Sequence, residues 1–320
     1  MIPFATAHPA TPLLKGLLTW IPGVQRAFYD RTAAGSTHSP AYCYGVWLKH
    51  LTLLARHGMD EVPARVVELG PGGSLGAGIA ALLSGAQTYT GIDVVRHATA
   101  QSTAVVLREL VNLFKARAPR PAKGWPDYDD CLDERLFPSR ILTEARLDHS
   151  LAPQRLAMLE EAVARMDSRP QHPSLRYVTS DRGSAVAEGA ADLVFSHVCL
   201  SLVDDLEGVY ADFARWLRPG GWMSHHIDFT SLGVTPEWNG HLKYTDAAWR
   251  IIVGQRPFFA SRERMSKHMK LLRENGFEVV RAYHGYRRDG IRRDQLAPRW
   301  RSISDVDLNC YGGFIIARKR

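Results

Sequence analysis

The stretch VVELGPGGSLGAG, from Val66 to Gly78, decides the fold. A branched apolar pair and an acid precede four glycines that fall within the seven residues from Gly70 to Gly76. Branched residues favour a strand, and apolar residues continue after the glycines as LGAGIAALLSGA, a pattern typical of a helix. We therefore expect a strand that ends in a tight turn, and a helix that begins beside a ligand.

Strand and helix patterns alternate along the rest of the chain. Strands are expected at ARVVELG, TYTGIDVV, LRYVTS, ADLVFSHVCL, GWMSHHIDF, FEVVRAYHGY and GGFIIARK. Helical patterns lie between them, and RPGG, residues 218–221, is expected to separate a helix from the fifth strand. This alternation predicts an α/β fold, a Rossmann-like doubly wound sheet with helices on both faces.

The chain divides into an extension and one larger domain. Residues 1–60 predict a helical N-terminal extension, which includes the helix pattern AYCYGVWLKHLTLLARHGM. Residues 61–320 predict the sheet domain, with insertions at about 118–172 and 230–260 that interrupt the alternation. The segment LLKGLLTWI predicts a short amphipathic helix, which packs on the protein or lies weakly on a membrane surface, and we favour the first.

Composition restricts the class of protein. The 320 residues are 45% hydrophobic and carry a net charge of +7, which fits a globular chain with an ample core. The four cysteines are too far apart for a metal or redox motif. No segment is long and apolar enough to span a bilayer, so a cytoplasmic protein is expected.

The glycine turn allows three ligands to be compared. A P-loop is excluded because no Lys followed by Ser or Thr closes the turn. A dinucleotide motif needs G-x-G-x-x-G, and here Gly76 comes one residue too late. Glu68, two residues before Gly70, would repel a pyrophosphate but suits a cationic amino group. S-adenosylmethionine carries such a group and has no phosphate.

Further residues fit the same cofactor. Asp93 follows the second strand, where an acid binds a ribose diol, and Asp181 follows the third, where it can accept from an adenine amino group. The start of the helix near Ser74 offers backbone N–H groups to a carboxylate. The expected cofactor-binding residues are Glu68, Gly70, Pro71, Gly72, Gly73, Ser74, Asp93, Asp181, Ser196 and His197.

These motifs, in this order, resemble those of class I S-adenosylmethionine-dependent methyltransferases. The resemblance rests on VVELGPGGSLG, GIDV, ADLVFSHV, WLRPGGWM and GFEVV…GGFIIARK, and it covers about residues 64–318. It implies a seven-stranded sheet whose last strand is antiparallel. The chain departs from the commonest pattern at Ser74, which stands where the third glycine usually lies.

A narrower resemblance spans nearly the whole chain. YCYGVWLKHL, ELGPGGSLG, SHHIDF and WNGHLKYTDAAWRIIVG are similar to segments of bacterial methyltransferases associated with surface-polysaccharide biosynthesis. This resemblance implies O-methylation of a sugar or another polar small molecule. Two rival functions stay open, a nucleotide-binding oxidoreductase and a non-catalytic protein that binds S-adenosylmethionine.

Several histidines are candidates for the catalytic base. Many methyltransferases of this class place a histidine after the fourth strand, where this chain has Leu200 to Val203 instead. Strand alternation puts His226 on the same face as Asp228, whereas the resemblance favours His225 with Asp228. His241 is a further candidate in the second insertion, where Trp238 and Asn239 suit a sugar-binding lid.

Partners other than a small-molecule or glycan acceptor are not expected. Four arginines, Arg287, Arg288, Arg292 and Arg293, can contact phosphates, but we favour the simpler interpretation that they lie near aspartates on a solvated loop. No nucleic-acid module is recognisable, and no residues have firm metal-ligand spacing, so neither nucleic acid nor metal is expected.

Overall fold

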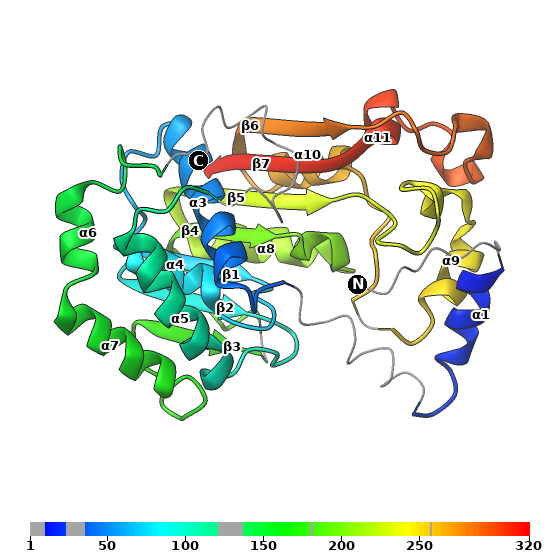
Figure 1. Cartoon of the computed structure of the whole chain (residues 1–320). Coiled ribbons are helices and arrows are strands. Elements are labelled where there is room, and N and C mark those ends of the chain that lie inside the picture. The colour runs from blue at the N-terminus through cyan, green and yellow to red at the C-terminus, as the bar shows by residue number, and fades with distance from the viewer. Residues whose placement is uncertain (1–9, 24–35, 121–136, 180–181, 257) are drawn as a thin grey trace.

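The computed structural model describes residues 10–23, 36–120, 137–179, 182–256 and 258–320. In these residues seven strands form one sheet in the order β3-β2-β1-β4-β5-β7-β6 (Figure 1). The strands are β1 Arg65–Leu69, β2 Thr88–Ile92, β3 Leu175–Val178, β4 Ala191–His197, β5 Leu217–Asp228, β6 Phe277–Tyr286 and β7 Cys310–Lys319. Only β7 is antiparallel to its neighbours, β5 and β6. The doubly wound sheet with an antiparallel last strand is confirmed.

Helices cover both faces of this sheet (Figure 1). The α-helices are α1 Thr11–Leu18, α3 Pro40–Arg56, α4 Gly76–Leu83, α5 Ala100–Lys115, α6 Glu144–Ser150, α7 Pro153–Ala164, α8 Leu206–Trp216, α9 Asp246–Val253, α10 Met265–Glu274 and α11 Asp305–Asn309. Short 3₁₀ helices are η2 Cys199–Leu202, η3 Gly240–Lys243, η4 Arg293–Gln295 and η5 Pro298–Trp300. Thus α1 and α3 belong to the expected extension, α6 and α7 to the first expected insertion, and α9 to the second.

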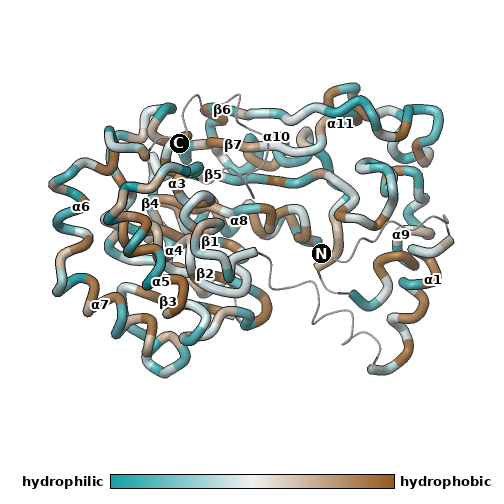
Figure 2. The backbone as a smooth tube through the Cα atoms, in the orientation of Figure 1, coloured by the Kyte–Doolittle hydropathy of each residue, from teal (hydrophilic) through white to brown (hydrophobic). Residues whose placement is uncertain are grey.

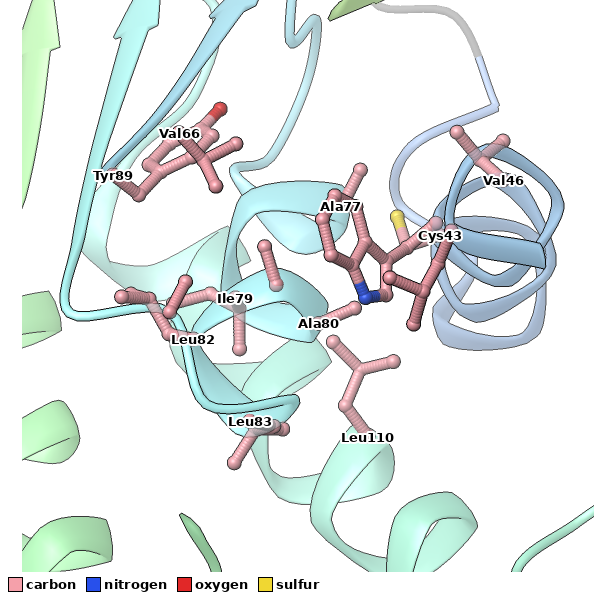
Figure 3. Packing of buried hydrophobic residues seen from close by; sticks show 14 of the residues in the cluster. Cys43, Val46, Val66, Ala77, Ile79, Ala80, Leu82, Leu83, Tyr89 and Leu110 are labelled. Atoms are coloured by element: carbon pink, nitrogen blue, oxygen red, sulfur yellow. The ribbon is translucent and has the colours of Figure 1, made fainter. Parts of the chain in front are cut away.

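The sheet separates two hydrophobic cores, one on each of its faces. On the first face, the side chains of Val66, Tyr89 and Phe195 are buried with residues of α3, α4 and α5. Figure 3 shows Val66 and Tyr89 beside α4 in this core. On the second face, Val67 and Val194 are buried with residues of α8 and α10. We call these the α3 face and the α8 face. Since neighbouring residues of a strand point to opposite faces, this assignment decides where each polar strand residue can act.

The glycines of the turn serve both backbone conformation and close packing. Gly70 and Gly72 have φ angles of 75° and 77°, which only glycine adopts at little cost. At Gly76 and Gly78, a Cβ atom would overlap the Cys43 side chain and the Tyr89 ring respectively. These glycines therefore let α4 pack directly against α3 and β2, and they fix α3 over the turn.

Two boundaries differ from the sequence predictions. Residues 218–221, RPGG, were expected between helix and strand, but they belong to β5. The β4–β5 pairing runs from Ala191–Leu217 to Leu193–Trp222, so this segment forms a bulge that leaves the ladder and returns to it. Strand β4 ends at His197 rather than continuing through Leu200, because Val198 adopts a left-handed conformation. In the described part of the chain, no helix is long and apolar enough to cross a membrane.

A buried arginine at the start of α10 links the chain after β5 to the segment that leads into β7. The Arg264 guanidinium, 2% exposed, donates to the carbonyl oxygens of Phe229, Asp307 and Cys310. Burial lowers the pKa of Arg264 to about 10, which still leaves it charged at neutral pH. The cation replaces water as the hydrogen-bond donor for backbone groups at three separate places in the chain.

We expect Arg264→Leu to lower the free energy of unfolding by about 3 kcal/mol, because three buried carbonyl groups would lose their donor. The change is measured by urea unfolding. Arg288→Leu is the control, since Arg288 is exposed, and it should change stability by less than about 0.5 kcal/mol. Equal stability of the two variants would contradict the role given to Arg264.

Candidate active site

A carboxyl group is buried at the carboxyl end of β1. Glu68 is 3% exposed on the α3 face, and the Tyr89 hydroxyl donates to its Oε2 at 2.5 Å. Burial raises the pKa of Glu68 to about 8, although the hydrogen bond from Tyr89 lowers it in part. No cationic side chain contacts this carboxyl group within the described residues. Glu68 is therefore a largely neutral acid at pH 7 that a cationic ligand group would ionise.

Asp93 lies next to the glycine turn. It follows β2, and its carboxylate accepts hydrogen bonds from the backbone N–H groups of Val94, Gly72 and Val95. Burial nevertheless raises the pKa of Asp93, and these hydrogen bonds oppose that effect. Glu68, the turn and Asp93 thus come together at the carboxyl ends of two neighbouring parallel strands, where doubly wound sheets bind ligands.

The remaining turn residues take structural roles. The hydroxyl of Ser74 donates to the carbonyl oxygen of Thr37, and its backbone N–H donates to the Thr37 hydroxyl at 3.3 Å. Gly73 accepts a hydrogen bond from Ser102 at 2.9 Å, and Pro71 packs beside Gly91. Ser74 therefore anchors the N-terminal segment behind the turn. Asp181, the expected adenine partner, lies outside the described residues.

The pleat of β5 places its two adjacent histidines on opposite faces of the sheet. In the register with β4, His225 lies beside Ser196 and His226 lies beside His197. His225 is on the α8 face, where it stacks on Phe213 with ring centroids 4.9 Å apart. His226 is on the α3 face, and its ring lies 4.6 Å from that of His197. His226, rather than His225, therefore shares the face of Glu68.

Three residues on the α3 face form a hydrogen-bonded chain. Ser224 Oγ lies 2.6 Å from His50 Nδ1, and His50 Nε2 lies 3.2 Å from His197 Nδ1. Ser224 and His50 are fully buried, whereas His197 is half-buried. The Nε2 atom of His197 has no hydrogen-bond partner among the described residues. One consistent set of tautomers has His197 donating to His50 and His50 donating to Ser224, with His197 Nε2 left as an acceptor.

The surroundings keep these imidazoles neutral. Burial lowers the pKa of His197 well below its usual value, and the charge of nearby Lys49 lowers it further. Burial likewise lowers the pKa values of His50 and His226, and neighbouring His197 and Lys49 contribute to both shifts. Lys49 itself is buried over the ring of Phe314, 5.2 Å from its centroid. At neutral pH, His197 is thus in the form that accepts a proton.

Tyr42 connects the carboxyl group to the histidines. It stands at the start of α3 with its ring 6.0 Å from that of His197, in an edge-on arrangement. Burial raises the pKa of Tyr42 to about 12, and the charges of Cys43 and Glu68 add to this effect. Tyr42 is therefore in ring contact with His197. Glu68 pairs with Phe195 in the β1–β4 register, so His197 lies two residues further along the neighbouring strand and on the same face, and the two belong to one site.

The chain is strained where His197 leaves the sheet. Val198 has a φ angle of 66°, which a β-branched residue rarely adopts. Its N–H donates to the His226 carbonyl oxygen at 2.8 Å, and its carbonyl accepts from Ser201 at 3.1 Å. The turn brings the side chain of Cys199 against Gly70. A residue held in such a conformation costs about 1–3 kcal/mol and is typical of functional sites.

Several predicted site residues are used elsewhere. Ser196 is buried on the α8 face and bonds His225 Nδ1 at 2.8 Å, so neither side chain faces Glu68. Burial lowers the pKa of His225 to about 3. The expected hydrogen bond of Asp228 with a histidine is not formed among the described residues, and Asp228 Oδ1 instead accepts from the backbone N–H of Thr230 at 2.7 Å.

The second insertion also differs from the expected sugar lid. Asn239 is fully committed, since it accepts from Ile291 N–H at 2.6 Å and donates to the carbonyls of Ile291 and Leu308. His241 is completely buried beside Trp249, and burial together with Arg264 and Arg262 lowers its pKa. In this structure His241 therefore lies inside the insertion and away from solvent.

The arginines of the C-terminal loop form local ion pairs. Arg287 pairs with Asp289, Arg292 with Asp294 and Arg293 with Asp305. This outcome agrees with the simpler of the two interpretations of this segment. The described residues also contain no group of three His, Cys, Asp or Glu side chains placed to hold a metal ion.

Sequence reasoning missed the contribution of α3. His50, Lys49 and Tyr42 lie in a regular amphipathic helix, where apolar spacing explains most positions and gives no sign of a site. One signal was present: adjacent Lys49 and His50 interrupt the apolar run GVWLKHLTLL. Both are completely buried, which is rare for lysine unless a function or a partner compensates.

Comparison with known proteins agrees with this geometry. Residues 154–224 match the family model described as a methyltransferase domain. The chain is 38% identical over 68 residues to malonyl-[acyl-carrier protein] O-methyltransferase of Xylella fastidiosa. That match covers 21% of this chain and 22% of the relative, so the chain spans only about a fifth of this relative's length.

Solved structures give looser likenesses. A putative S-adenosylmethionine-dependent methyltransferase from Listeria monocytogenes is 12% identical, with a TM-score of 0.39, and covers 87% of this chain and 98% of its own. Phosphoethanolamine N-methyltransferase 2 of Haemonchus contortus, in complex with S-adenosyl-L-methionine, is 14% identical, with a TM-score of 0.43, and covers 92% and 60% respectively. No acceptor follows from these likenesses.

The family match includes the strand that carries His197 and most of the strand that carries Ser224 and His226. Residues 154–224 include β3, β4, α8 and the first part of β5. The segment that matches the methyltransferase-domain model therefore forms one side of the candidate site.

Proposed function

We propose that this protein is an S-adenosylmethionine-dependent methyltransferase that acts on a hydroxyl group. The observation that carries the proposal is Glu68, a buried carboxyl group without a cation at the end of β1, beside a turn of positive-φ glycines. Methylation by this cofactor transfers a methyl group from a sulfonium to a nucleophile in line with the breaking bond. The residues of the site fit the cofactor's cationic amino group and its ribose diol.

Glu68, Asp93 and the backbone of the turn would each hold one part of the cofactor. Glu68 would bind the amino group, because a cation there lowers the cost of ionising a buried acid. Asp93 would accept from the ribose hydroxyl groups, and backbone N–H groups of the turn would hold the carboxylate. An acid at position 68 disfavours the pyrophosphate of a dinucleotide for the same electrostatic reason.

His197 is the base in this proposal. Its Nε2 would take the acceptor's proton, while Nδ1–H donates to His50, whose other nitrogen is bonded to Ser224. The chain of hydrogen bonds holds the imidazole in one orientation and allows the tautomer in which Nε2 accepts, and orienting the base is the role that a third group plays in catalytic triads. Tyr42 lies edge-on to the ring and limits its movement.

The requirement for a base favours a hydroxyl acceptor. The curated relative is named for O-methylation of malonyl-acyl-carrier protein, and a carboxylate acceptor carries no proton at pH 7. A sugar hydroxyl must lose its proton during transfer, which is what a neutral, oriented imidazole provides. We therefore propose a sugar or another polar hydroxyl compound, in keeping with the resemblance to methyltransferases of surface-polysaccharide biosynthesis.

The first prediction concerns S-adenosylhomocysteine, the product form of the cofactor. Because Glu68 must ionise to bind an amino group, binding should release nearly one proton at pH 7, and affinity should rise about tenfold per pH unit from pH 6 to 7. Calorimetry in buffers of different ionisation enthalpy measures both quantities. Glu68→Gln should remove the proton release, and Asp93→Asn should weaken binding but keep it.

Glu61→Gln is the matched control, because Glu61 is exposed on the loop before β1 and should leave binding unchanged. NAD and NADP serve as competing ligands. Binding of NAD in place of S-adenosylhomocysteine would show that the glycine turn is a dinucleotide-binding motif. Binding without a pH dependence would show that Glu68 does not contact the amino group.

The second prediction concerns the base. Nucleotide sugars, glycan fragments and malonyl-acyl-carrier protein are offered as acceptors, and methyl gain is measured by mass spectrometry. With the acceptor found, His197→Gln should lower kcat by about 10²–10⁴-fold. Because burial and Lys49 lower the pKa of His197, kcat should stay level from pH 8 down to pH 6.5. Over the same range, kcat/KM for the cofactor should fall as Glu68 becomes protonated.

His50→Gln should give a smaller loss of kcat, because it releases the orientation of His197 but leaves the base in place. His57→Gln is the control at the other end of α3, where His57 bonds Tyr283, and it should keep full activity. Full activity in His197→Gln would refute the assignment of the base. Cofactor binding without turnover of any acceptor would favour the non-catalytic alternative.

A further inference from the structure

A tyrosine holds one oxygen of the Glu68 carboxyl group. The Tyr89 hydroxyl donates to Oε2 of Glu68 at 2.5 Å, and the two side chains are buried, with exposed fractions of 0% and 3% respectively. Tyr89 is the only hydrogen-bond donor to this carboxyl group among the described residues. Within that part of the chain the other oxygen, Oε1, accepts no hydrogen bond, so its lone pairs remain available to a ligand.

Two glycines make room for this tyrosine. A Cβ atom at Gly78, inside α4, would overlap the Tyr89 ring, and one at Gly91, in β2, would lie 2.9 Å from the Tyr89 hydroxyl oxygen. Neither glycine has a positive φ angle, so backbone conformation does not explain them. Gly91 also lies directly beside Glu68 in the β1–β2 register, where the tyrosine hydroxyl takes the place of a side chain. Since glycine is unfavourable inside a helix or strand, the chain accepts a local cost that seats Tyr89 against Glu68.

The apolar surroundings make this single hydrogen bond important. Helix α4, which packs on the Tyr89 ring, contains only apolar residues and glycine (Figure 2). Burial and the charge of Glu68 raise the pKa of Tyr89 well above its usual value, so the hydroxyl keeps its proton and remains a donor. In such surroundings a donor stabilises the charged carboxylate more than the neutral acid.

The other titratable groups near Glu68 do not replace this donor. They are Asp93 after β2, Tyr42 and Cys43 on α3, and Cys199 on η2. The charge of Asp93 raises the pKa of Glu68. Burial raises the pKa values of Tyr42 and Cys43 to about 12, and it also raises that of Cys199, so these three groups are uncharged at neutral pH. Ionisation of Glu68 is thus opposed by burial and by Asp93, and it is helped by Tyr89.

We propose that Tyr89 is a positioning residue of the cofactor site, whose hydroxyl holds Oε2 of Glu68 and leaves Oε1 to meet the cationic amino group of the ligand. This inference rests on the proposed function, in which Glu68 binds that amino group. In the unliganded site the acid proton lies on Oε1, because Oε2 already accepts from Tyr89. Glu68 loses this proton to solvent as it pairs with the ammonium group, and the bond from Tyr89 strengthens as the carboxylate becomes charged.

The direction of the pH effect follows from this role. Burial raises the pKa of Glu68 to about 8, and the hydrogen bond from Tyr89 lowers it in part. Without the hydroxyl, the charged form would lose its donor, and the pKa of Glu68 would rise further. Because the ligand pairs with the charged form, its affinity would then reach a plateau only at a higher pH than in the wild-type protein.

The test is calorimetric titration of the full-length protein with S-adenosylhomocysteine from pH 6 to 9. We expect Tyr89→Phe, which removes only the hydroxyl, to weaken binding about tenfold at pH 7. The deficit should shrink to about threefold or less at pH 9, because most of the carboxyl group is then charged in both proteins. Gly91→Ala, which displaces the hydroxyl and keeps the ring, is a second variant that should change the pH profile in the same direction. In the Glu68→Gln background, Tyr89→Phe should leave the pH profile unchanged, since no carboxyl group remains to ionise.

Tyr44→Phe is the matched control. Tyr44 is equally buried in the core of the α3 face, but its hydroxyl donates to the carbonyl oxygen of Ala118 at 2.6 Å. This variant should bind like the wild type at every pH, and melting followed by circular dichroism shows that each variant is folded. Equal affinity of Tyr89→Phe and the wild type, or a deficit that stays constant from pH 6 to 9, would overturn the inference and leave the proposed function intact. Absence of binding by the wild type would overturn both.

Discussion

The burial of the Glu68 carboxyl group beneath α3 and α4 is the constraint on which the site depends. A carboxylate cannot be buried there without a partner, so the acid is held largely neutral and bonded to Tyr89. Helix α3 contributes to this arrangement, because Tyr42 and Cys43 lie near enough to Glu68 for its charge to raise their pKa values. Helix α3 belongs to the N-terminal extension, and it is nevertheless part of the site.

The pleat of β5 carries a second constraint. Each residue along this strand belongs either to the α3 face with Glu68 or to the α8 face with Phe213, and the pairing with β4 fixes which. His225 and His226 are adjacent in sequence, yet they have different neighbours and different hydrogen bonds. The bulge at residues 218–221 precedes this region, so the register at the histidines is set after the ladder has resumed at Trp222.

Much of the fold could be predicted from the sequence, and less of the site. The glycine turn and the alternating patterns are local or periodic signals, whereas the antiparallel last strand was implied by the family resemblance, and the structure confirms the sheet that they predict. The contact of His50 with His197 joins residues 147 positions apart, and no local pattern encodes it. Strand parity predicted that His226 and His225 lie on opposite faces, and the structure shows that the face of His226 is also that of Glu68. Asn239 and Asp228 have residue types that suit ligand binding, but backbone groups supplied by distant or adjacent segments occupy them instead.

The strained residue at the end of β4 shows how these constraints meet. A glycine at position 198 would adopt the observed φ of 66° at little cost, yet the chain has valine there. The conformation persists because the N–H of Val198 is bonded to the His226 carbonyl and the turn is closed by Ser201. Those bonds hold His197 at the last position of the strand and direct Cys199 toward Gly70. The strain is thus maintained by the same strand that supplies His226, which ties the orientation of the proposed base to the register of the sheet.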